Sequence, residues 1–388
     1  MSNRPENPAG RKLVIINQMP NYLTFGLANA FNTRFDSVAL VAGGFDGNPE
    51  MLGKSIEVRM INRLYDRPSW KKAGSYVLAL IRMWWLLMTR YRRYEVLFVS
   101  VPPMGYLLNL VLPHRFSMVI WDLYPDAFKV TGMTQKHLVY RMWSWVNRKS
   151  FRKAFRIFTI GESLADAISN YVHRSKLIVH PIWAMFQDSP RIPRDQNRFV
   201  ALHGLSDQFV VQYSGNIGAT HNVELLIDIA ERLKSESKIL FQIIGRGPRL
   251  QTLQQMAKQR GLLNVQFYAF QPEEMFVHSL SAANLGVVIL NEKVSRGSVP
   301  SKAYNLMSFG IPALYVSSPD SQLANDANRF GHAACFAAVQ LNDIAEFIIR
   351  MSKQDVDYHQ MAQAAKKAAE SFRPKNAECF VDSYLRNT

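Results

Sequence analysis

Residues 209–218 read Phe-Val-Val-Gln-Tyr-Ser-Gly-Asn-Ile-Gly, and this stretch decides the fold. Its first five residues predict a buried strand, and Gly215 and Gly218 predict a tight loop. The pattern from His221 onward predicts an amphipathic helix. A glycine loop lets the backbone approach an anion, and the free N–H groups of a helix start can bind phosphate. A tight turn without any ligand explains the same residues equally well.

Apolar, β-rich runs alternate with helical patterns along the whole chain. The expected strands are residues 12–16, 38–41, 95–99, 117–121, 156–160, 209–213, 239–244, 265–268, 285–289 and 313–316. Such alternation predicts parallel sheets with crossover helices. The runs are continuous rather than alternating, which is typical of sheets covered on both faces. We therefore expect an α/β fold.

The length of 388 residues fits two doubly wound domains. We expect an N-terminal domain over residues 1–185 and a C-terminal domain over residues 186–372. Residues 373–388 are expected to form a helix that returns to the N-terminal domain. Pro190, Pro193 and several charges predict that residues 186–208 are a linker.

Composition excludes several classes of protein. Hydrophobic residues make up 48% and charged residues 20%, which indicates globular domains with real cores. The two cysteines form no CxxC pair, so a disulfide framework and a structural zinc site are not expected. Residues 1–10 lack the apolar core of a signal peptide, and the apolar runs 76–89 and 96–112 do not predict a transmembrane helix. We expect a cytoplasmic protein.

The positive charge is concentrated in one half of the chain. Residues 1–187 hold 25 Lys and Arg against 11 Asp and Glu, a net charge of +14, whereas residues 188–388 carry only +2. A basic half indicates an anionic partner, for which nucleic acid and the cytoplasmic membrane leaflet are the two candidates.

Two further segments carry residues suited to phosphate. Residues 241–248, Phe-Gln-Ile-Ile-Gly-Arg-Gly-Pro, predict a strand that ends in a glycine turn, where Arg246 could reach a phosphate or simply be solvated. Residues 290–312 predict a Ser-, Gly- and cation-rich loop before a helix that opens near Pro300. An ordinary capped helix does not explain this enrichment, whereas a diphosphate cradle does.

The order and spacing of the three segments resemble the C-terminal domain of the family 4 retaining glycosyltransferases. The nearest pattern is that of the bacterial subgroup that builds O-antigens, capsules and exopolysaccharides, whose members read YSGNIG, then IGxGP, then PSKxYxxMxxGIP. All three stand here in that order. Residues 120–126, 159–164 and 180–183 are similar to the family's DLWP, SES and PNW segments. The resemblance covers roughly residues 95–320 and implies the GT-B fold, two Rossmann-like domains facing a central cleft.

The chain departs from the wider family at several positions. An Arg and a Lys of the family's first loop become Asn216 and His221, and two glutamates eight residues apart align with Gly297 and Asn305. The active-site His becomes Trp121, next to a retained Asp122.

The resemblance implies transfer of a sugar from a nucleotide-sugar to a polyprenyl-diphosphate-linked saccharide, with retention of the anomeric configuration. It also favours UDP as the nucleotide. Lys302 is expected to supply the main charge and Asp122 to hydrogen-bond the sugar or acceptor, unless Asp122 merely caps a turn. The expected donor-binding residues are Gly215, Asn216, Gly218, His221, Arg246, Arg296, Gly297, Ser298, Ser301 and Asn305. The sequence contains no DxD-type pair after a suitable strand, so neither a metal nor a cofactor is expected.

The N-terminal half is expected to hold the acceptor. Residues 19–26 follow the first strand, and we expect Asn21, Tyr22 and Gly26 to bind the acceptor from a loop. Trp84 and Trp85, with lysines and arginines on both sides, predict an interfacial helix on the inner face of the membrane, although a core helix would look similar. The aliphatic neighbours of these tryptophans argue against nucleic-acid binding. A GT-B sugar-nucleotide epimerase is the other enzymatic alternative.

Overall fold

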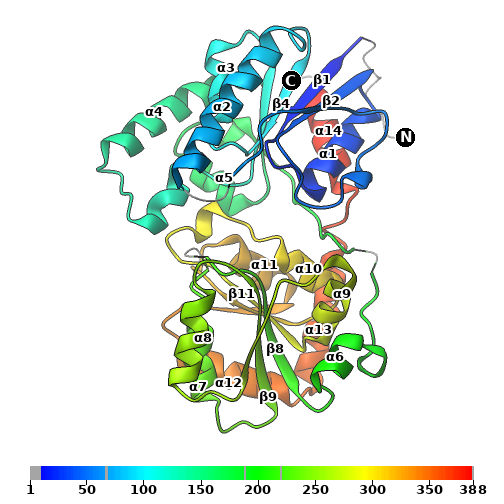
Figure 1. Ribbon diagram of the computed structural model, residues 1–388, viewed down its shortest axis with the longest axis vertical. Helices are drawn as coiled ribbons and strands as arrows, with labels where there is room; N and C mark the ends of the chain where they lie inside the picture. Colours follow the sequence, from blue (N-terminus) through cyan, green and yellow to red (C-terminus); the bar gives the residue numbers. More distant parts are fainter. Residues whose placement is uncertain (1–9, 66–68, 188, 219–220, 387–388) are drawn as a thin grey trace. The chain divides into compact units, whose positions relative to one another are not determined.

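The structure is a computed structural model that describes residues 10–65, 69–187, 189–218 and 221–386 (Figure 1). The side chains of Ser69, Val130, Thr131 and Arg296 lie outside this description. The chain divides into two compact units. Unit 1 comprises Met1–Phe128, Met133–Ile182 and Pro374–Thr388, and unit 2 comprises Lys129–Gly132 and Trp183–Arg373. These boundaries lie within three residues of those expected at 185/186 and 372/373.

Unit 1 is built on a parallel seven-stranded sheet in the order β3-β2-β1-β4-β5-β6-β7. Its strands are β1 Lys12–Ile16, β2 Ser37–Ala42, β3 Glu57–Met60, β4 Glu95–Val99, β5 Phe116–Ile120, β6 Ile157–Thr159 and β7 Leu177–Val179. Its helices are α1 Tyr22–Asn32, α2 Ser69–Met88, α3 Leu108–Val111, α4 Leu138–Lys153, α5 Glu162–Ile168 and α14 Asn376–Leu385. Right-handed crossovers place α1 on one face of the sheet and α2 to α5 on the other.

Helix α14 packs within unit 1, beside α1 (Figure 1). The Tyr384 ring meets the Phe31 ring edge-on at 5.3 Å between centroids. The Tyr384 hydroxyl donates to Glu95 Oε2 at 2.7 Å, and Arg11 holds the same carboxylate. Buried aromatic contacts thus fix the end of the chain on the sheet to which its first strand belongs.

Unit 2 is built on a parallel six-stranded sheet in the order β10-β9-β8-β11-β12-β13. Its strands are β8 Phe209–Asn216, β9 Ile239–Arg246, β10 Val265–Tyr268, β11 Leu285–Ile289, β12 Ala313–Val316 and β13 Ala333–Phe336. Its helices are α6 Arg198–His203, α7 Glu224–Arg232, α8 Leu250–Gln259, α9 Glu273–Ala282, α10 Lys302–Ser308, α11 Gln322–Phe330, α12 Leu341–Ser352 and α13 Val356–Ala369.

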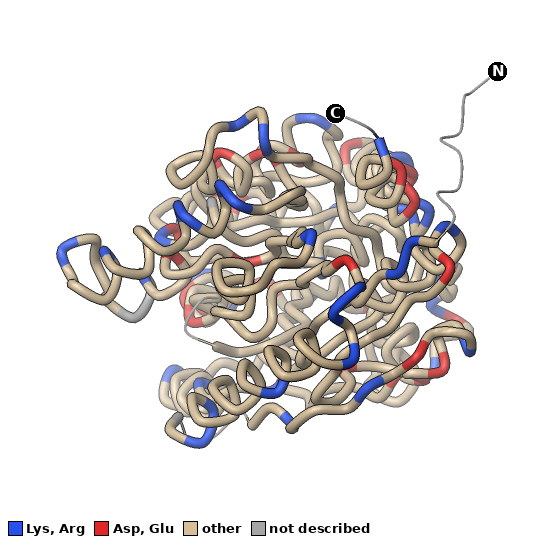
Figure 2. Tube along the Cα trace, turned by 90° about the horizontal axis from the view of Figure 1, so that it is seen from above, with Lys and Arg blue, Asp and Glu red and all other residues tan. Residues whose placement is uncertain are grey.

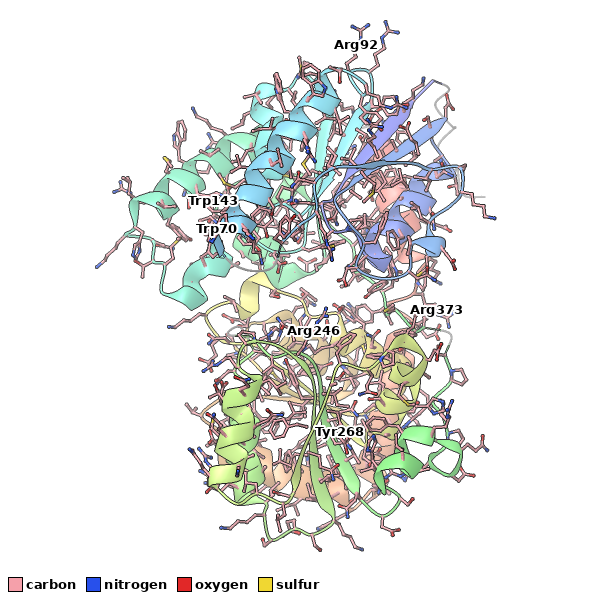
Figure 3. All side chains as sticks on the ribbon, viewed as in Figure 1. Trp70, Arg92, Trp143, Arg246, Tyr268 and Arg373 are labelled. Atoms are coloured by element: carbon pink, nitrogen blue, oxygen red, sulfur yellow. The ribbon has the colours of Figure 1, made fainter. Side chains whose placement is uncertain are left out.

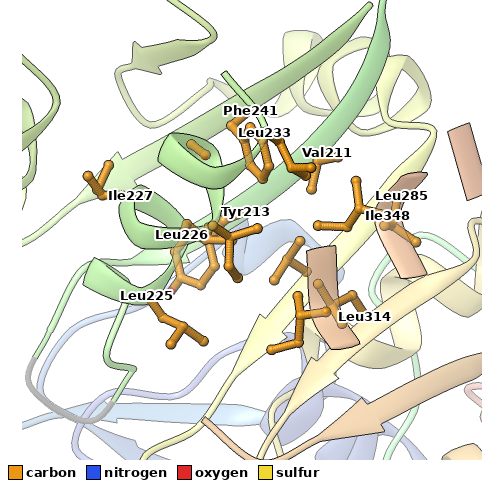
Figure 4. Packing of buried hydrophobic residues seen from close by; sticks show 14 of the residues in the cluster. Val211, Tyr213, Leu225, Leu226, Ile227, Leu233, Phe241, Leu285, Leu314 and Ile348 are labelled. Carbon is orange, nitrogen blue, oxygen red and sulfur yellow. The ribbon is translucent and has the colours of Figure 1, made fainter. Parts of the chain in front are cut away.

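The strands of unit 2 are covered on both faces. Val211 and Phe241 pack with Leu226 and Ile348 in the cluster shown in Figure 4, whereas Val210 belongs to a separate cluster on the opposite side of β8. Successive strand residues point to opposite faces, so both faces demand apolar side chains. This packing produces the continuous apolar runs of the sequence.

Each of the ten expected strands is present, and three others were missed. The missed strands are β3, β7 and β13, and all three lie at a sheet edge. They are only three or four residues long, and their side chains are mostly half-buried or exposed, so they lack the long buried apolar run that identifies a central strand.

The expected linker over residues 186–208 is wrong. This segment contains α6, whose Phe199 and Val200 are buried against α9 and the sheet. The Arg194 guanidinium donates to the Ala282 carbonyl and to Asn284 Oδ1, both at 3.1 Å. The prolines and charges that indicated a linker therefore belong to the packed body of unit 2.

None of the helices within the described ranges combines the length and the apolar character that crossing a membrane requires.

Candidate functional site

Three chemistry-bearing segments meet at one edge of unit 2. They follow β9, β8 and β11, which are neighbours in a parallel sheet, so their carboxyl ends lie side by side. Strands β8 and β9 run further than expected, and Gly215 pairs with Gly245 and Asn216 with Arg246. The first two segments are thus extended strand ends rather than open loops at these positions.

The glycines of these strand ends allow the two chains to touch. At Gly245, where φ is 152°, an added Cβ would lie 1.9 Å from the Gly215 carbonyl oxygen. At Gly247, where φ is 159°, it would lie 2.3 Å from the Ile217 carbonyl oxygen. The Ile217 amide also donates to the Arg246 carbonyl at 2.9 Å. Close backbone packing, rather than ligand access, requires glycine at 245 and 247.

Lys302, the first residue of α10, reaches the end of β8. Its ammonium group donates to the Tyr213 hydroxyl at 3.1 Å and lies 4.3 Å from the centre of the Tyr213 ring. A Cβ at Gly215 would lie 2.9 Å from the same nitrogen. Burial lowers the pKa of Lys302 to about 7. A partly desolvated ammonium group beside exposed strand-end backbone suits an incoming anion.

His221 lies in the same cluster. Its ring centroid is 6.5 Å from that of Tyr213, and its amide donates to the Gly218 carbonyl at 3.2 Å. Burial, and then the charge of Lys302, lower the pKa of His221 to about 3. The imidazole is therefore neutral near neutral pH. Helix α7 begins at Glu224 and not near His221 as expected.

The third segment leads into the start of α10. Among the residues that the structure describes, the amides of Ser301 and Lys302 and the hydroxyls of Ser298 and Ser301 make no hydrogen bond. The Gly297 amide, however, donates to the Val294 carbonyl at 3.0 Å and is not available to a ligand. Of the backbone cradle that we expected at residues 297–301, only groups from Ser298 onward can therefore bind a ligand. The Arg296 side chain lies outside the described residues.

A hollow of about 300 Å³ of empty space, open solvent included, adjoins Lys302. Its lining residues are Gln212, Ser214, Phe276, Leu280, Val287, Lys302, Asn305 and Leu306. Asn305 Oδ1 accepts from the Met185 amide at 2.9 Å. Within the described chain, the Asn305 amide nitrogen and the Ser214 hydroxyl have no partner. Both can therefore donate to a bound molecule.

Arg246 and Asn216 are the exposed members of the expected set. The Arg246 guanidinium lies 5.2 Å from the centre of the Phe270 ring, and its position is marked in Figure 3. The Asn216 carbonyl accepts the Tyr213 hydroxyl at 2.7 Å. Tyr213 therefore connects Lys302 to the backbone at the end of β8.

Asp122 belongs to unit 1 and follows β5. Its carboxylate is exposed and, among the described residues, has no hydrogen bond or ion pair, so it does not cap a turn. The amide of the preceding residue, Trp121, donates to Ser100 Oγ at 2.9 Å. Although Asp122 is exposed by its accessible surface, the protein atoms packed around the carboxylate partly desolvate it and raise its pKa to about 6.

The expected acceptor loop at residues 19–26 is mostly helix. Helix α1 begins at Tyr22, and Asn21 Oδ1 caps it by accepting from the Leu23 and Thr24 amides at 3.2 and 3.4 Å. Gly26 lies inside α1, so its backbone is not an open loop. The helical pattern at 22–32 begins too close to the first strand to leave a loop, and Asn21 is its N-cap signal.

Residues 195–368 match the family model for glycosyl transferases group 1. The chain carries a group 1 glycosyltransferase domain. This domain occupies unit 2 and includes all of the segments around Lys302.

Two curated relatives share part of the sequence. WcaI of Escherichia coli (strain K12), provisionally named a colanic acid biosynthesis glycosyl transferase, is 29% identical over 229 residues, 57% of this chain and 56% of WcaI. WbjE of Pseudomonas aeruginosa, provisionally named a glycosyltransferase, is 23% identical over 58% of this chain and 56% of WbjE. The chain thus spans a little more than half the length of the curated relatives that it matches.

Solved structures resemble the chain over nearly its full length. HepE of Anabaena, in complex with UDP and glucose, has a TM-score of 0.74 at 12% identity, covering 97% of this chain and 99% of HepE. WaaG, a glycosyltransferase involved in lipopolysaccharide biosynthesis, has a TM-score of 0.71 at 13% identity, covering 97% of this chain and all of WaaG. The two parallel-sheet α/β units confirm the expected GT-B fold.

Sequence reasoning missed the roles of Tyr213 and Ser214 in the glycosyltransferase domain. Tyr213 is the last residue of the strand that we expected and Ser214 follows it, and a fully buried tyrosine looks like an ordinary core residue. The available signal was its hydroxyl, because a buried tyrosine hydroxyl usually finds a polar partner.

Proposed function

We propose that the protein is a retaining glycosyltransferase of cell-surface polysaccharide biosynthesis. It transfers a sugar from a nucleotide-sugar, most simply a UDP-sugar, to a polyprenyl-diphosphate-linked saccharide. The group 1 domain and the two curated relatives support the class of reaction. The observation that carries the proposal is the ammonium group of Lys302 at the end of β8, together with the Ser301 and Lys302 amides at the start of α10, which have no partner among the described residues.

The donor diphosphate occupies the start of α10 in this proposal. The amides of Ser301 and Lys302 and the hydroxyl of Ser298 donate to its oxygens, and the ammonium group of Lys302 neutralises charge. The Asn305 amide nitrogen donates to the ribose or to the distal phosphate. HepE, a structural neighbour, binds UDP, which supports the choice of base.

Charge stabilisation is the main task of these residues during transfer. The bond between the anomeric carbon and the diphosphate oxygen breaks, and a bond to the acceptor oxygen forms on the same face of the sugar. The proton of the acceptor hydroxyl passes to the departing diphosphate. The diphosphate gains negative charge as it leaves, and donors already in place stabilise that charge without reorganising. Asp122 hydrogen-bonds the sugar or the acceptor hydroxyl.

No metal has a step in this proposal. Among the described residues, no three His, Cys, Asp or Glu side chains gather as a metal site would require. That the reaction needs neither a metal nor a cofactor stays a prediction, which an assay with EDTA tests.

The acceptor binds unit 1, where Asn21, Tyr22 and Gly26 remain predicted contacts, and the enzyme works attached peripherally to the inner membrane face. The excess of basic residues in the first 187 positions supports an anionic surface.

The decisive experiment measures donor choice first and transfer second. A thermal-shift panel of UDP, GDP and ADP with their sugars is expected to give selective stabilisation by one nucleotide, UDP. Transfer is then assayed with the stabilising donor and lipid-linked saccharides in vesicles. Release of an epimerised sugar without lipid would establish the epimerase alternative and contradict the proposal. Retention of DNA in place of vesicles at matched salt would contradict it as well.

A further inference from the structure

Helix α4 exposes an unusual number of large apolar residues for a surface helix. Its large apolar residues Leu138, Val139, Met142 and Trp145 face outward and are 78%, 53%, 61% and 54% exposed. The side that faces the protein combines buried Ser144, Asn147 and Ser150 with the buried aromatic residues Tyr140 and Phe151. These inner groups are held by hydrogen bonds: the Tyr106 hydroxyl donates to Asn147 Oδ1, and Ser150 Oγ donates to the Tyr106 carbonyl at 3.0 Å.

These hydrogen bonds help to hold α4 against unit 1, and the large apolar residues of its outer side remain exposed. A helix normally buries its apolar stripe because that burial supplies most of its tertiary stabilisation. Here residues 138, 142 and 145 follow helical spacing on the solvent side, and neighbouring turns add Val139. An exposed apolar stripe of this kind marks a surface that contacts another phase or another molecule.

Helix α2 presents a second stripe on the same side of the sheet. Ala79, Met83 and Leu87 are its buried residues. Its outer large apolar residues, 41–71% exposed, are Trp70, Val77, Leu78, Ile81, Trp84, Trp85 and Met88. Trp70, labelled in Figure 3, lies in the first turn of this helix, and Arg92 lies in the turn that follows it.

The two stripes form one surface. Right-handed crossovers place α2, α3 and α4 in one layer over the sheet, and α3 lies next to α4 (Figure 1). Between the two long helices, Met104 and Val111 are also exposed, at 39% and 67%. A groove beside α2, lined in part by Met60, Ile81 and Trp85, continues the apolar surface toward β3. We call the outer residues of α2, α3 and α4 the apolar platform.

The charged residues around the apolar platform indicate which kind of partner it contacts. Helices α2 and α4 contain eight Lys and Arg and no Asp or Glu: Lys71, Lys72, Arg82, Arg141, Arg148, Lys149, Arg152 and Lys153. Basic segments are marked in blue in Figure 2. The Lys149 ammonium lies 3.7 Å from the centre of the Trp145 ring, so charge and apolar surface are adjacent. Apolar helices whose own charged residues are all cations fit the interface of an anionic bilayer, where tryptophan is also favoured.

We propose that the apolar platform docks the protein on an anionic lipid bilayer, with α4 inserting beside α2. The inference rests on the membrane attachment in the proposed function and deepens it, because the sequence indicated only α2. A helix held by polar contacts on its inner side can present its apolar side to lipid without unfolding the domain.

Vesicle flotation of the full chain tests the proposal. We expect binding to vesicles of phosphatidylcholine with phosphatidylglycerol, weaker binding to phosphatidylcholine alone, and loss of the difference at high salt. The α4 pair Met142→Gln/Trp145→Gln is expected to weaken vesicle binding about tenfold or more, and the α2 pair Trp84→Gln/Trp85→Gln likewise. The matched control is Leu263→Gln/Val339→Gln, which replaces side chains of unit 2 that are 95% and 86% exposed, and is expected to bind like the wild type.

Three results would overturn the proposal: no wild-type binding to anionic vesicles, unchanged binding of the α4 pair, or a wild-type dimer that the α4 pair dissociates in light scattering. The same variants are heated with and without UDP-glucose. A retained nucleotide-dependent rise in Tm in the α4 pair shows that donor binding is independent of the platform. Vesicle binding without any nucleotide response in the wild type would refute the proposed donor and leave the platform standing.

Discussion

The ammonium group of Lys302 lies 3.1 Å from the hydroxyl of Tyr213 and 4.3 Å from the centre of its ring. The same hydroxyl donates to the Asn216 carbonyl at 2.7 Å, and the Tyr213 ring is fully buried. Tyr213 thus positions the ammonium group of Lys302 at the end of β8. Burial lowers the pKa of Lys302 to about 7, which makes this charge sensitive to pH.

Lys302→Ala is expected to lower kcat/KM by about tenfold or more, because the cation that stabilises the leaving diphosphate is lost. The Tm should not fall, since the variant removes a desolvated charge and alanine favours the helical conformation at the start of α10. Lys302→Arg should recover part of the activity. Turnover equal to the wild type in Lys302→Ala would move the diphosphate site elsewhere.

Binding of UDP-glucose is expected to take up close to one proton per site at about pH 8, and little well below pH 7, because the diphosphate restores the charge of Lys302. Calorimetry in buffers of different ionisation enthalpy measures this uptake. UDP-glucose is chosen because its diphosphate does not titrate in this range. Equal uptake in Lys302→Ala would assign the proton to another group.

Stability follows the same titration. The folded-state pKa of Lys302, about 7, is below its ordinary value of 10.5, so the folded state holds fewer protons between these two pH values. The free energy of unfolding should therefore rise with pH across this window, and the contribution of Lys302 should be least favourable below it. Denaturant titrations of the wild type and Lys302→Ala separate that contribution from the rest of the chain.

Gly245→Ala and Gly297→Ala are expected to fail in different ways. At Gly245 the added Cβ would meet the Gly215 carbonyl at 1.9 Å with φ at 152°, so the variant should lose about 3 kcal/mol or more of stability. At Gly297 nothing lies within 4 Å, so the Tm should be unchanged while affinity for the nucleotide-sugar falls. Thermal unfolding and donor titration separate the two effects. Normal affinity in Gly297→Ala would exclude close approach of the donor there.

Asp122→Asn is expected to lower activity about tenfold without lowering the Tm, since the carboxylate has no partner to lose among the described residues. The pKa of Asp122 is about 6, above its ordinary value, so the folded protein binds this proton more tightly than the unfolded chain does. Its contribution to stability is therefore present at low pH and lost as pH rises through about 6. Wild-type kcat/KM should fall below that pH, and an unchanged acid limb in Asp122→Asn would contradict the assignment.

The sequence predicts the central strands well and the edges poorly. Residues 209–213 and 285–289 are mostly apolar because helices cover both faces of their sheet, and such runs can be recognised without a structure. Strands β3, β7 and β13 give a weaker signal because they are only three or four residues long and mostly half-buried or exposed. Residues 186–208 were mistaken for a linker because prolines and charges indicate irregular backbone, but they do not show whether that backbone packs against a domain.

By itself, the sequence determined the α/β class and the three segments, one of them containing Lys302, that meet at one edge of unit 2. Those features depend on local order along the chain, where strand, glycine turn and helix start follow one another. Only the tertiary structure decided that Gly245 packs on Gly215, that Tyr213 holds Lys302, and that α4 turns its apolar side outward. These relationships join residues far apart in sequence, so their energies depend on a contact or an exposure that no single segment specifies.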